Sequence, residues 1–216
     1  MKLYKYMSLQ NLWFVLDVIV NQRFYCAHWS ELNDPLEGRY EIYLGESSSG
    51  IEENMVTRIE GAKDKYRVAS LSADSTNFLL WSHYADGHKG VAIEVEIPDN
   101  HPDLIEVIYT PFSSVFSTSG DIKDDMRHLF NGKGEEWAYE NEYRIVAESN
   151  YFILPKPVTR MLLGPRASAD QEKILLATFP SSVEVVRTQL DRTQGTLIVS
   201  SSNNSIHRTS FDGRCE

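Results

Sequence analysis

The most informative stretch of the chain is the one in which the spacing of apolar residues changes from helical to extended. Between residues 78 and 85 the apolar positions recur every three to four residues, which predicts a helix with one apolar face that stops at Asp86-Gly87. From Val91 to Ile97 every second residue is apolar, which predicts a strand. The intervening turn should therefore bring together four side chains capable of chemistry: those of His83, Tyr84, His88 and Lys89.

The same patterns predict the remaining elements. Strands are expected at 3–6, 23–28, 39–44, 66–72, 105–109, 143–147, 158–163, 183–190 and 196–199. Helices are expected at 9–20, 51–65, 122–130 and 169–178, with Ser8 and Ser168 as N-caps of the first and the last. We expect strand 91–97 to pair with 105–109 across the turn at Pro98–Pro102.

Helices and strands do not alternate regularly along the chain, which argues against a doubly wound parallel sheet. The predicted fold class is α+β: a single domain over residues 1–199 with a mixed, largely antiparallel sheet flanked by helices. Residues 200–216 are polar without an apolar period and are predicted to form a flexible tail.

Composition narrows the class of protein. A net charge of −10 argues against a broad basic face for duplex nucleic acid and suits a soluble protein with a small-molecule or protein partner. The two cysteines, Cys26 and Cys215, are too few for a disulfide framework and are expected to be free thiols in a reducing cytoplasm. The apolar run from Leu12 to Val20 is interrupted by Asp17, and no stretch reaches the roughly 20 apolar residues of a membrane span. We therefore expect a cytoplasmic protein without a membrane partner.

A second cluster of polar residues, at 137–144, leads into the strand predicted at 143–147. A period of two places Glu140, Glu142 and Arg144 on one face. If that face is solvated, the three charges form an ordinary surface stripe. If it lines a cleft, Glu142 could act as a general base or stabilise a developing cation, while Arg144 keeps it ionised or binds an anion.

Two further motifs leave alternatives open. Asn33-Asp34-Pro35 is typical of a tight turn, but Asp34 and Glu37 could also be carboxylates that face a cleft. His83 and His88 are five residues apart, a poor spacing for chelation from one helix, so no metal site is expected and either histidine could be structural. The chain contains no glycine-rich phosphate loop and no nucleophile elbow.

Five motifs occur in the order seen in a large bacterial and phage family, domain of unknown function 2971. They are Leu3-Tyr-Lys-Tyr6 with Ser8-Leu9, Leu32-Asn-Asp-Pro-Leu-Glu37, Trp81-Ser-His-Tyr-Ala-Asp-Gly-His-Lys-Gly-Val91, Val107-Ile-Tyr109 and Trp137-Ala-Tyr-Glu-Asn-Glu-Tyr-Arg144. The chain resembles that family over about residues 3 to 165. The family name itself implies no activity.

The order of a tyrosine-rich first strand, a central His-Tyr element and a late Glu-x-Glu-Tyr-Arg strand is also similar to that of ADP-ribosyltransferases. This likeness implies a split mixed sheet that binds NAD. It implies that Glu142 orients the ribose and stabilises an oxocarbenium-like transition state, and that Tyr84 stacks on nicotinamide. Tyr4 or Tyr6 would stand near the position of that family's first-strand histidine or arginine, and Lys5 does not match it.

Three hypotheses follow. The first is an enzyme, a transferase or hydrolase that acts on NAD or another nucleotide. Its role would lie in the conflict between bacteria and phage, as the resemblance implies for some family members. Its catalytic residues would be Glu142, His83 and Tyr84, and its ligand-binding residues Tyr4, Tyr6, Asp34, Glu37, His88, Lys89, Glu140 and Arg144. The second is a non-catalytic module that binds a nucleotide or a protein and holds phosphate or carboxylate through Arg144 and Lys89. In the third, both clusters are structural, and Trp81, Tyr84, Trp137 and Tyr143 form one aromatic core.

Overall fold

The computed structural model describes residues 1–38, 41–42, 51–110, 115–116 and 121–199. Its strands are β1 (Lys2–Met7), β2 (Arg23–Tyr25), β3 (Ala27–His28), β4 (Glu41–Ile42), β5 (Arg67–Ser72), β6 (Val91–Glu96), β7 (Leu104–Glu106), β8 (Ile108–Thr110), β9 (Val115–Phe116), β10 (Gly132–Gly134), β11 (Glu142–Ala147), β12 (Tyr151–Ile153), β13 (Arg160–Leu163), β14 (Glu184–Asp191) and β15 (Thr196–Val199). Its α-helices are α1 (Leu12–Asn21), α2 (Ile51–Lys63), α3 (Phe78–Tyr84), α4 (Ile122–Leu129) and α5 (Ala169–Thr178), and its 3-10 helices are η1 (Trp29–Glu31) and η2 (Glu135–Glu140).

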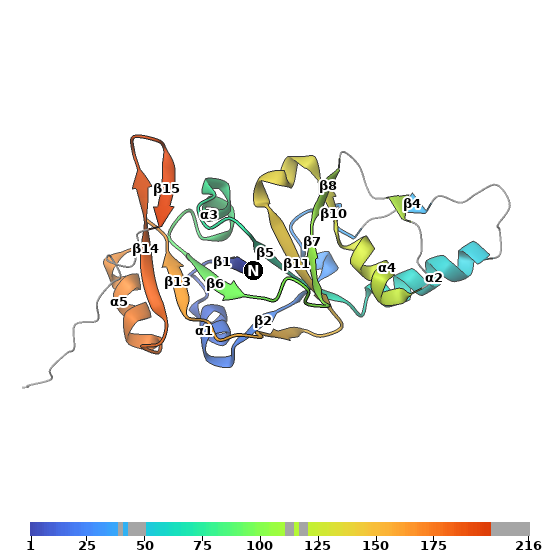
Figure 1. Cartoon of the computed structure of the whole chain (residues 1–216), viewed down its shortest axis with the longest axis horizontal. Helices are drawn as coiled ribbons and strands as arrows, with labels where there is room; N and C mark the ends of the chain where they lie inside the picture. The colour runs from blue at the N-terminus through green and yellow to red at the C-terminus, as the bar shows by residue number, and fades with distance from the viewer. Residues whose placement is uncertain (39–40, 43–50, 111–114, 117–120, 200–216) are drawn as a thin grey trace, which may run out of the picture.

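One large sheet runs through the molecule in the order β15-β14-β13-β6-β1-β5-β11-β7, with β3 added beside β5. Every pairing in this sheet is antiparallel except that of β13 with β14. Figure 1 shows the sheet extending from the C-terminal hairpin and α5 at one end to α2 and α4 at the other. The α+β class with a mixed, mostly antiparallel sheet is therefore confirmed.

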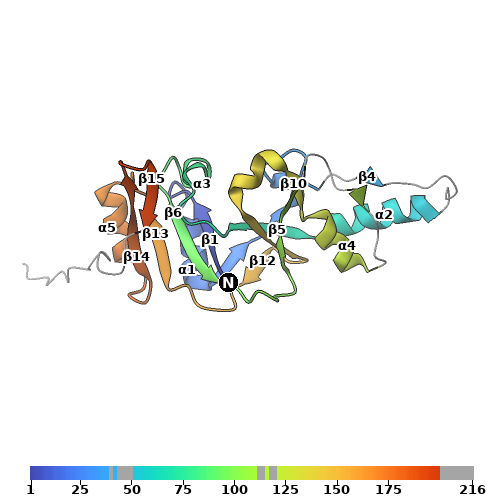
Figure 2. The ribbon, with the colours of Figure 1, turned by 45° about the horizontal axis from the view of Figure 1, so that its top comes forward.

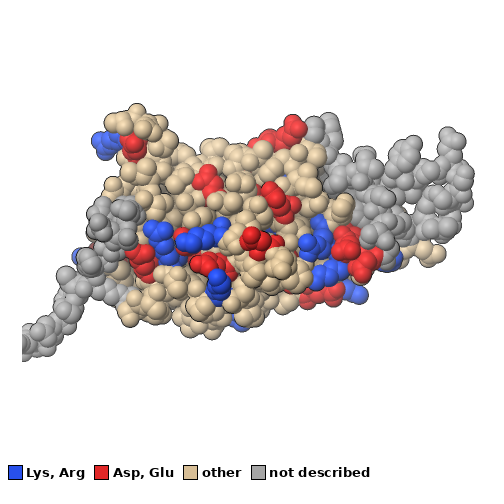
Figure 3. All heavy atoms as spheres, viewed as in Figure 1, with Lys and Arg blue, Asp and Glu red and all other residues tan. Residues whose placement is uncertain are grey.

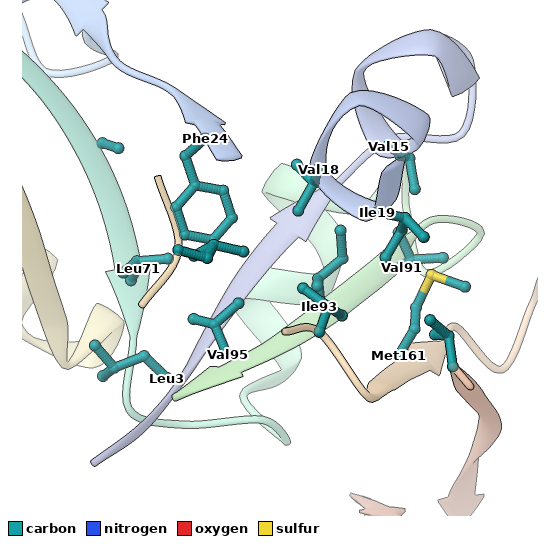
Figure 4. Close-up of a cluster of buried hydrophobic side chains, with 14 of the residues drawn as sticks. Leu3, Val15, Val18, Ile19, Phe24, Leu71, Val91, Ile93, Val95 and Met161 are labelled. Carbon is teal, nitrogen blue, oxygen red and sulfur yellow. The ribbon is translucent and has the colours of Figure 1, made fainter. Parts of the chain in front are cut away.

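The main apolar core lies between α1 and the central strands β1 and β6. Val15, Val18 and Ile19 of α1 are buried against Leu3 and Ile93 (Figure 4). The other face of β1 and β6 is covered by α3, where Trp81 is fully buried and meets Tyr6 edge-on at 5.3 Å. Because α1 and α3 lie on opposite sides of the same strands (Figures 1 and 2), both faces of β1 and β6 are closed.

A separate apolar cluster holds the far end of the sheet. Ile59 of α2 packs with Met126 and Phe130 at α4 against Val68 of β5 and Val146 of β11. The N-cap of α4, Asp121, accepts hydrogen bonds from the backbone of Lys123 and Asp124, which satisfies donors that the first helical turn leaves open. This cluster positions Phe130, whose carbonyl contacts the candidate site described below.

Several expectations about the elements are corrected. The predicted pairing of 91–97 with 105–109 is wrong: β6 pairs with β1 and β13, and β7 pairs with β11. The predicted strand 23–28 is interrupted at Cys26, whose backbone N–H donates to the carbonyl of Asn150. The helix predicted from residue 9 begins at Leu12, so its N-cap position is Asn11 and not Ser8. Two residues of its apolar run, Trp13 and Val20, are 74% and 65% exposed.

Three strands, β9, β10 and β12, were not expected from the sequence. All three are short and pair outside the main sheet: β9 with β4, β10 with β8 and β12 with β2. The predicted tail at 200–216 and most of the strand predicted at 39–44 lie outside the described residues.

On the face seen in Figure 3, acidic and basic side chains are interspersed, and neither sign forms a broad region. In the part of the chain that the structure describes, none of the helices combines the length and the apolar character that crossing a membrane requires.

Candidate functional site

A pocket with a volume of about 190 Å³ opens beside β1, β5 and the start of β11. Its lining combines tyrosines, carboxylates and two lysines. The lining residues are Tyr4, Lys5, Tyr6, Glu31, Leu32, Asn33, Glu37, Ser70, Leu71, Ser72, Leu80, Tyr84, Lys133, Glu140 and Glu142. Glu31 and Asn33 are exposed, so the rim of the pocket reaches the surface, whereas the carboxylates deeper in it are buried.

Below the pocket, Arg144 joins two of these carboxylates. Its Nε donates to Oε1 of Glu142 at 2.9 Å, and its Nη2 donates to Oε1 of Glu37 at 2.8 Å and Oε2 of Glu142 at 3.1 Å. Its Nη1 donates to the carbonyl of Phe130 at 2.8 Å. Arg144 is fully buried, with 0% exposure, so these contacts replace the water that the guanidinium leaves on folding.

Lys133 is the second buried cation of this network. Its Nζ lies 2.5 Å from Oε2 of Glu140, 2.9 Å from Oε2 of Glu142 and 3.4 Å from Oε1 of Glu37. The ring of Trp137 covers the ammonium at 5.0 Å, within the range of a cation–π contact. Three carboxylates thus meet around one ammonium group.

Local backbone geometry explains why these side chains converge. Asn141 has a φ of 45°, a left-handed conformation that asparagine tolerates, and it ends η2. This turn leaves Glu140 and Glu142 on the same side of the chain, where both reach Lys133. Gly38, directly after Glu37, has a φ of 66°, a conformation in which a residue with a side chain would be strained.

The environment pushes the pKa values of Glu142 and Glu37 in opposite directions. Burial alone would raise the pKa of Glu142, but the charge and hydrogen bonds of Arg144 and the charge of Lys133 outweigh burial and lower this pKa to about 2. For Glu37 burial dominates, and its pKa is raised although Arg144 and Lys133 act against this shift. Oε2 of Glu37 is buried and has no hydrogen-bond partner among the described residues. Glu142 is therefore held as an anion, whereas burial makes the ionised form of Glu37 less favourable than that of an ordinary glutamate.

Three polar groups complete the site. The hydroxyl of Tyr84 donates to Oε1 of Glu140 at 2.7 Å, and that of Tyr109 accepts a hydrogen bond from the backbone N–H of Glu142 at 2.8 Å. The Nζ of Lys5 donates to the carbonyl of Ser70 at 2.9 Å, and burial lowers the pKa of Lys5. The two tyrosines fix the glutamates, and Lys5 adds an ammonium group on the β1 side of the pocket.

The structure brings together part of the residue set expected from the sequence. Tyr4, Tyr6, Glu37, Tyr84, Glu140 and Glu142 line the pocket, and Arg144 lies behind Glu37 and Glu142. The charged face of β11 is therefore buried, and the interpretation as a solvated stripe is wrong.

The other expected residues lie elsewhere. His83 is exposed between the rings of Tyr84 and Tyr139, at 6.2 and 6.4 Å, and does not line the pocket. Asp34 is buried but serves the predicted turn: its Oδ1 accepts from the backbone N–H of Leu36 at 2.8 Å.

The turn after α3 does not form the single cluster that was expected. His88 lines a different cavity and Lys89 is exposed, so these two side chains are separated from Tyr84. The aromatic residues do not form one core either, because Trp81 and Tyr84 belong to the cluster under α3 while Tyr143 packs in the main core.

Sequence reasoning missed Lys133, the cation on which three glutamates converge. It lies between two glycines in a stretch expected to follow a helix, where a lysine is usually solvated. Its only sequence signal is the isolated Lys in Gly132-Lys-Gly134, seven residues before Glu140. Lys5, Ser70 and Tyr109 were also absent from the expected set.

Within the described ranges, no group of three or more metal-ligating side chains has the geometry of a metal site. In the carboxylate cluster it is the ammonium of Lys133 that occupies the centre. No protein-family model, no curated protein and no solved structure matches this chain.

Proposed function

We propose that this protein is an enzyme that breaks or transfers a glycosidic bond of a nucleotide-like substrate, with the sugar held in the pocket beside β11. The observation that supports this proposal is the pairing of Glu142, whose pKa is lowered, with Glu37, whose pKa is raised, in the lining of one pocket. Two carboxyl groups with pKa values moved apart are the usual arrangement for dividing an acid–base role from an electrostatic one.

Glu142 is suited to stabilise positive charge. Because Arg144 and Lys133 keep it ionised, it can face the oxocarbenium-like carbon that develops as the glycosidic bond breaks. A group held so strongly in the ionised form is a poor proton carrier, so the general-base role considered for Glu142 is assigned instead to Glu37.

Glu37 is suited to move the proton. When the C1–N bond of a nicotinamide nucleotide breaks, the bonding electron pair goes to the ring nitrogen and releases neutral nicotinamide. Water or an acceptor hydroxyl then forms the new bond to C1, and its proton passes to the ionised carboxylate of Glu37. For a leaving group that departs as an anion, protonated Glu37 supplies the proton instead.

The size of the pocket limits what it can enclose. A volume of about 190 Å³ is below the range of roughly 300 to 1,000 Å³ typical of sites for drug-sized ligands. The pocket suits one sugar with part of its base rather than a whole dinucleotide. The tyrosines in its wall, Tyr4, Tyr6 and Tyr84, offer apolar ring surface with polar edges for such a group.

The alternative of a non-catalytic nucleotide module receives less support. It relied on Arg144 and Lys89 for the phosphate, yet Arg144 is fully buried with its nitrogens engaged and Lys89 is exposed outside the pocket lining. The resemblance to ADP-ribosyltransferases agrees with the assignment of Glu142 and remains a prediction.

The test is release of the base from NAD, ADP-ribose and nucleoside monophosphates, followed by chromatography. We expect turnover by the wild type and by Glu136→Gln, an exposed glutamate of η2, and at least a hundredfold loss in both Glu37→Gln and Glu142→Gln. Circular dichroism of each variant checks that it is folded. Ligand that binds and is recovered unchanged would favour the binding module, and turnover that survives in both pocket variants would contradict the proposal.

A further inference from the structure

A second and larger cavity lies on the other side of α3. Leu80 and Tyr84 of this helix line the first pocket, whereas Phe78 and Ser82 line the second. These pairs belong to different faces of the helix, because residues four apart share a face. The second cavity has a volume of about 630 Å³ and lies between the turn after α3, the end of β13 and the β14–β15 hairpin.

The lining of this cavity is cationic in a chain with a net charge of −10. Arg166, Arg187 and Arg192 contribute to it, and the described lining residues include no carboxylate. Arg187 is bound to Glu172 and to the carbonyl of Ala167. Arg166 donates from Nη1 to the carbonyl of Gly87 at 3.3 Å, but both it and Arg192 are exposed. Two guanidinium groups are therefore accessible to a ligand at this cavity.

His88 gives the cavity a buried polar wall. The residue is 6% exposed, and its Nδ1 has no hydrogen-bond partner among the described residues. Burial and the charge of Arg166 lower the pKa of His88, so the imidazole is neutral at neutral pH. The ring of Phe78, which is 49% exposed, lies 4.3 Å from that of His88 and forms an aromatic surface at the cavity.

The turn that carries His88 is held in an uncommon conformation. Asp86, Gly87 and His88 have consecutive φ values of 49°, 59° and 71°. The carbonyl of His88 accepts from the backbone N–H of Arg166 at 3.0 Å, and a Cβ on Gly164 would lie only 2.2 Å from that carbonyl oxygen. The close approach fixes the backbones of His88 and Arg166 relative to one another, which favours a preorganised site.

We propose that this second cavity binds a phosphorylated small molecule, with the phosphate at Arg166 and Arg192 and an aromatic or apolar body against Phe78 and Leu190. Guanidinium groups bind phosphate oxygens with paired hydrogen bonds, and an exposed aromatic ring offers a stacking surface. The cavity volume lies within the range of roughly 300 to 1,000 Å³ usual for small-molecule sites. The assignment does not depend on the activity proposed for the first pocket.

The first experiment measures pyrophosphate binding by isothermal titration calorimetry. We expect the double variant Arg166→Gln/Arg192→Gln to bind at least about tenfold more weakly than the wild type, a loss of about 1.4 kcal/mol. The control is Lys65→Gln/Lys173→Gln, which removes two exposed charges away from the cavity and should bind as the wild type does. Absence of binding to the wild type, unchanged binding to the arginine variant, or equal weakening in the control would each overturn the proposal.

The second experiment tests the aromatic body with ADP. We expect ADP to bind the wild type more tightly than pyrophosphate does, and Phe78→Ala to remove most of that difference while leaving the pyrophosphate affinity within about twofold. The assignment of Phe78 would be overturned if ADP and pyrophosphate bound the wild type equally well, or if Phe78→Ala left the difference between them unchanged. Since Glu37 and Glu142 are untouched in these variants, their results are independent of the activity assays on the first pocket.

Discussion

The two sides of α3 show two ways in which this chain uses charge. On the side of Leu80 and Tyr84, the cations Lys133 and Arg144 are buried and bound to glutamates. On the side of Phe78 and Ser82, Arg166 and Arg192 remain exposed at a larger cavity without carboxylates among its described lining residues. The first arrangement fixes the ionisation states of protein groups, and the second leaves charge accessible to a ligand.

A buried charged group can take part in chemistry without destabilising the fold only if every charge around it has a counter-charge or a hydrogen-bond partner. A buried ion pair gains little net stability over an apolar replacement of both partners, but the loss of one partner is costly because the other stays buried and unpaired. Removing one of the exposed arginines leaves no buried carboxylate among the described residues without a counter-charge. Substitutions on the two sides of α3 should therefore differ most in their effect on stability.

The largest effect is expected from Arg144→Met. This change leaves Glu37 and Glu142 buried with only Lys133 as counter-charge, so the free energy of unfolding should fall by about 3 to 5 kcal/mol. Urea denaturation monitored by circular dichroism measures the change. Arg192→Met, an exposed arginine at the other cavity, is the matched control and should change stability by less than about 0.5 kcal/mol. Equal effects of the two substitutions would remove the distinction between the two sides.

The next effect concerns the pH dependence of stability in two glutamate variants. The lowered pKa of Glu142 contributes stability that is present above its ordinary pKa of 4.5 and is lost as pH falls toward about 2. Glu142→Gln should therefore cost roughly 3 kcal/mol at pH 7, and the cost should shrink below pH 4.5.

Glu37→Gln should show the opposite trend. Because the pKa of Glu37 is raised, the folded state binds its proton more tightly than the unfolded state does. The resulting contribution to the free energy of unfolding is fully present below pH 4.5 and is lost as pH rises through the pKa of the folded state. Relative to the wild type, the variant should therefore gain stability as pH increases. Denaturation curves between pH 3 and pH 8, with Glu136→Gln as the exposed control, measure both trends; parallel curves for the two pocket variants would contradict the assignment of different roles.

A smaller effect is expected from Tyr84→Phe. The hydroxyl donates to Oε1 of Glu140 at 2.7 Å, and its loss should cost about 1 to 2 kcal/mol because the acceptor is a buried carboxylate. The control is Tyr4→Phe. The hydroxyl of Tyr4 lies 3.3 Å from Oε2 of Glu94, so its loss should lower the free energy of unfolding by less. Denaturant midpoints compare the two variants, and a larger loss in Tyr4→Phe would reverse the order of the two contacts.

The local elements of this fold were largely predictable from apolar periodicity. The strands predicted at 3–6 and 66–72 and the N-cap predicted at Ser168 depend on local patterns, and they agree with the structure. The partner of β6 was not predictable, because β1 and β13 are distant in sequence and no local pattern specifies them.

The candidate site was predictable to a similar degree. A period of two placed Glu142 and Arg144 on one face correctly, but it contains no information on whether that face meets water or protein. The composition around Lys133 gives no sign that this side chain is buried; only the tertiary contacts with the three glutamates show it. The turn after α3 was expected to be one cluster, yet Tyr84 and His88 line two different cavities, and His83 and Lys89 are exposed.

The smallest effect on stability is expected where the effect on binding is expected to be large. Arg166→Gln/Arg192→Gln removes two exposed charges, so the free energy of unfolding should change by less than about 0.5 kcal/mol, although pyrophosphate binding is weakened. A thermal-unfolding series with and without pyrophosphate measures both quantities in one experiment. Stabilisation by pyrophosphate in the wild type and its loss in the double variant would place accessible charge on this side of α3. A large loss of stability without ligand would instead mean that these arginines hold the fold together, as Arg144 does on the other side.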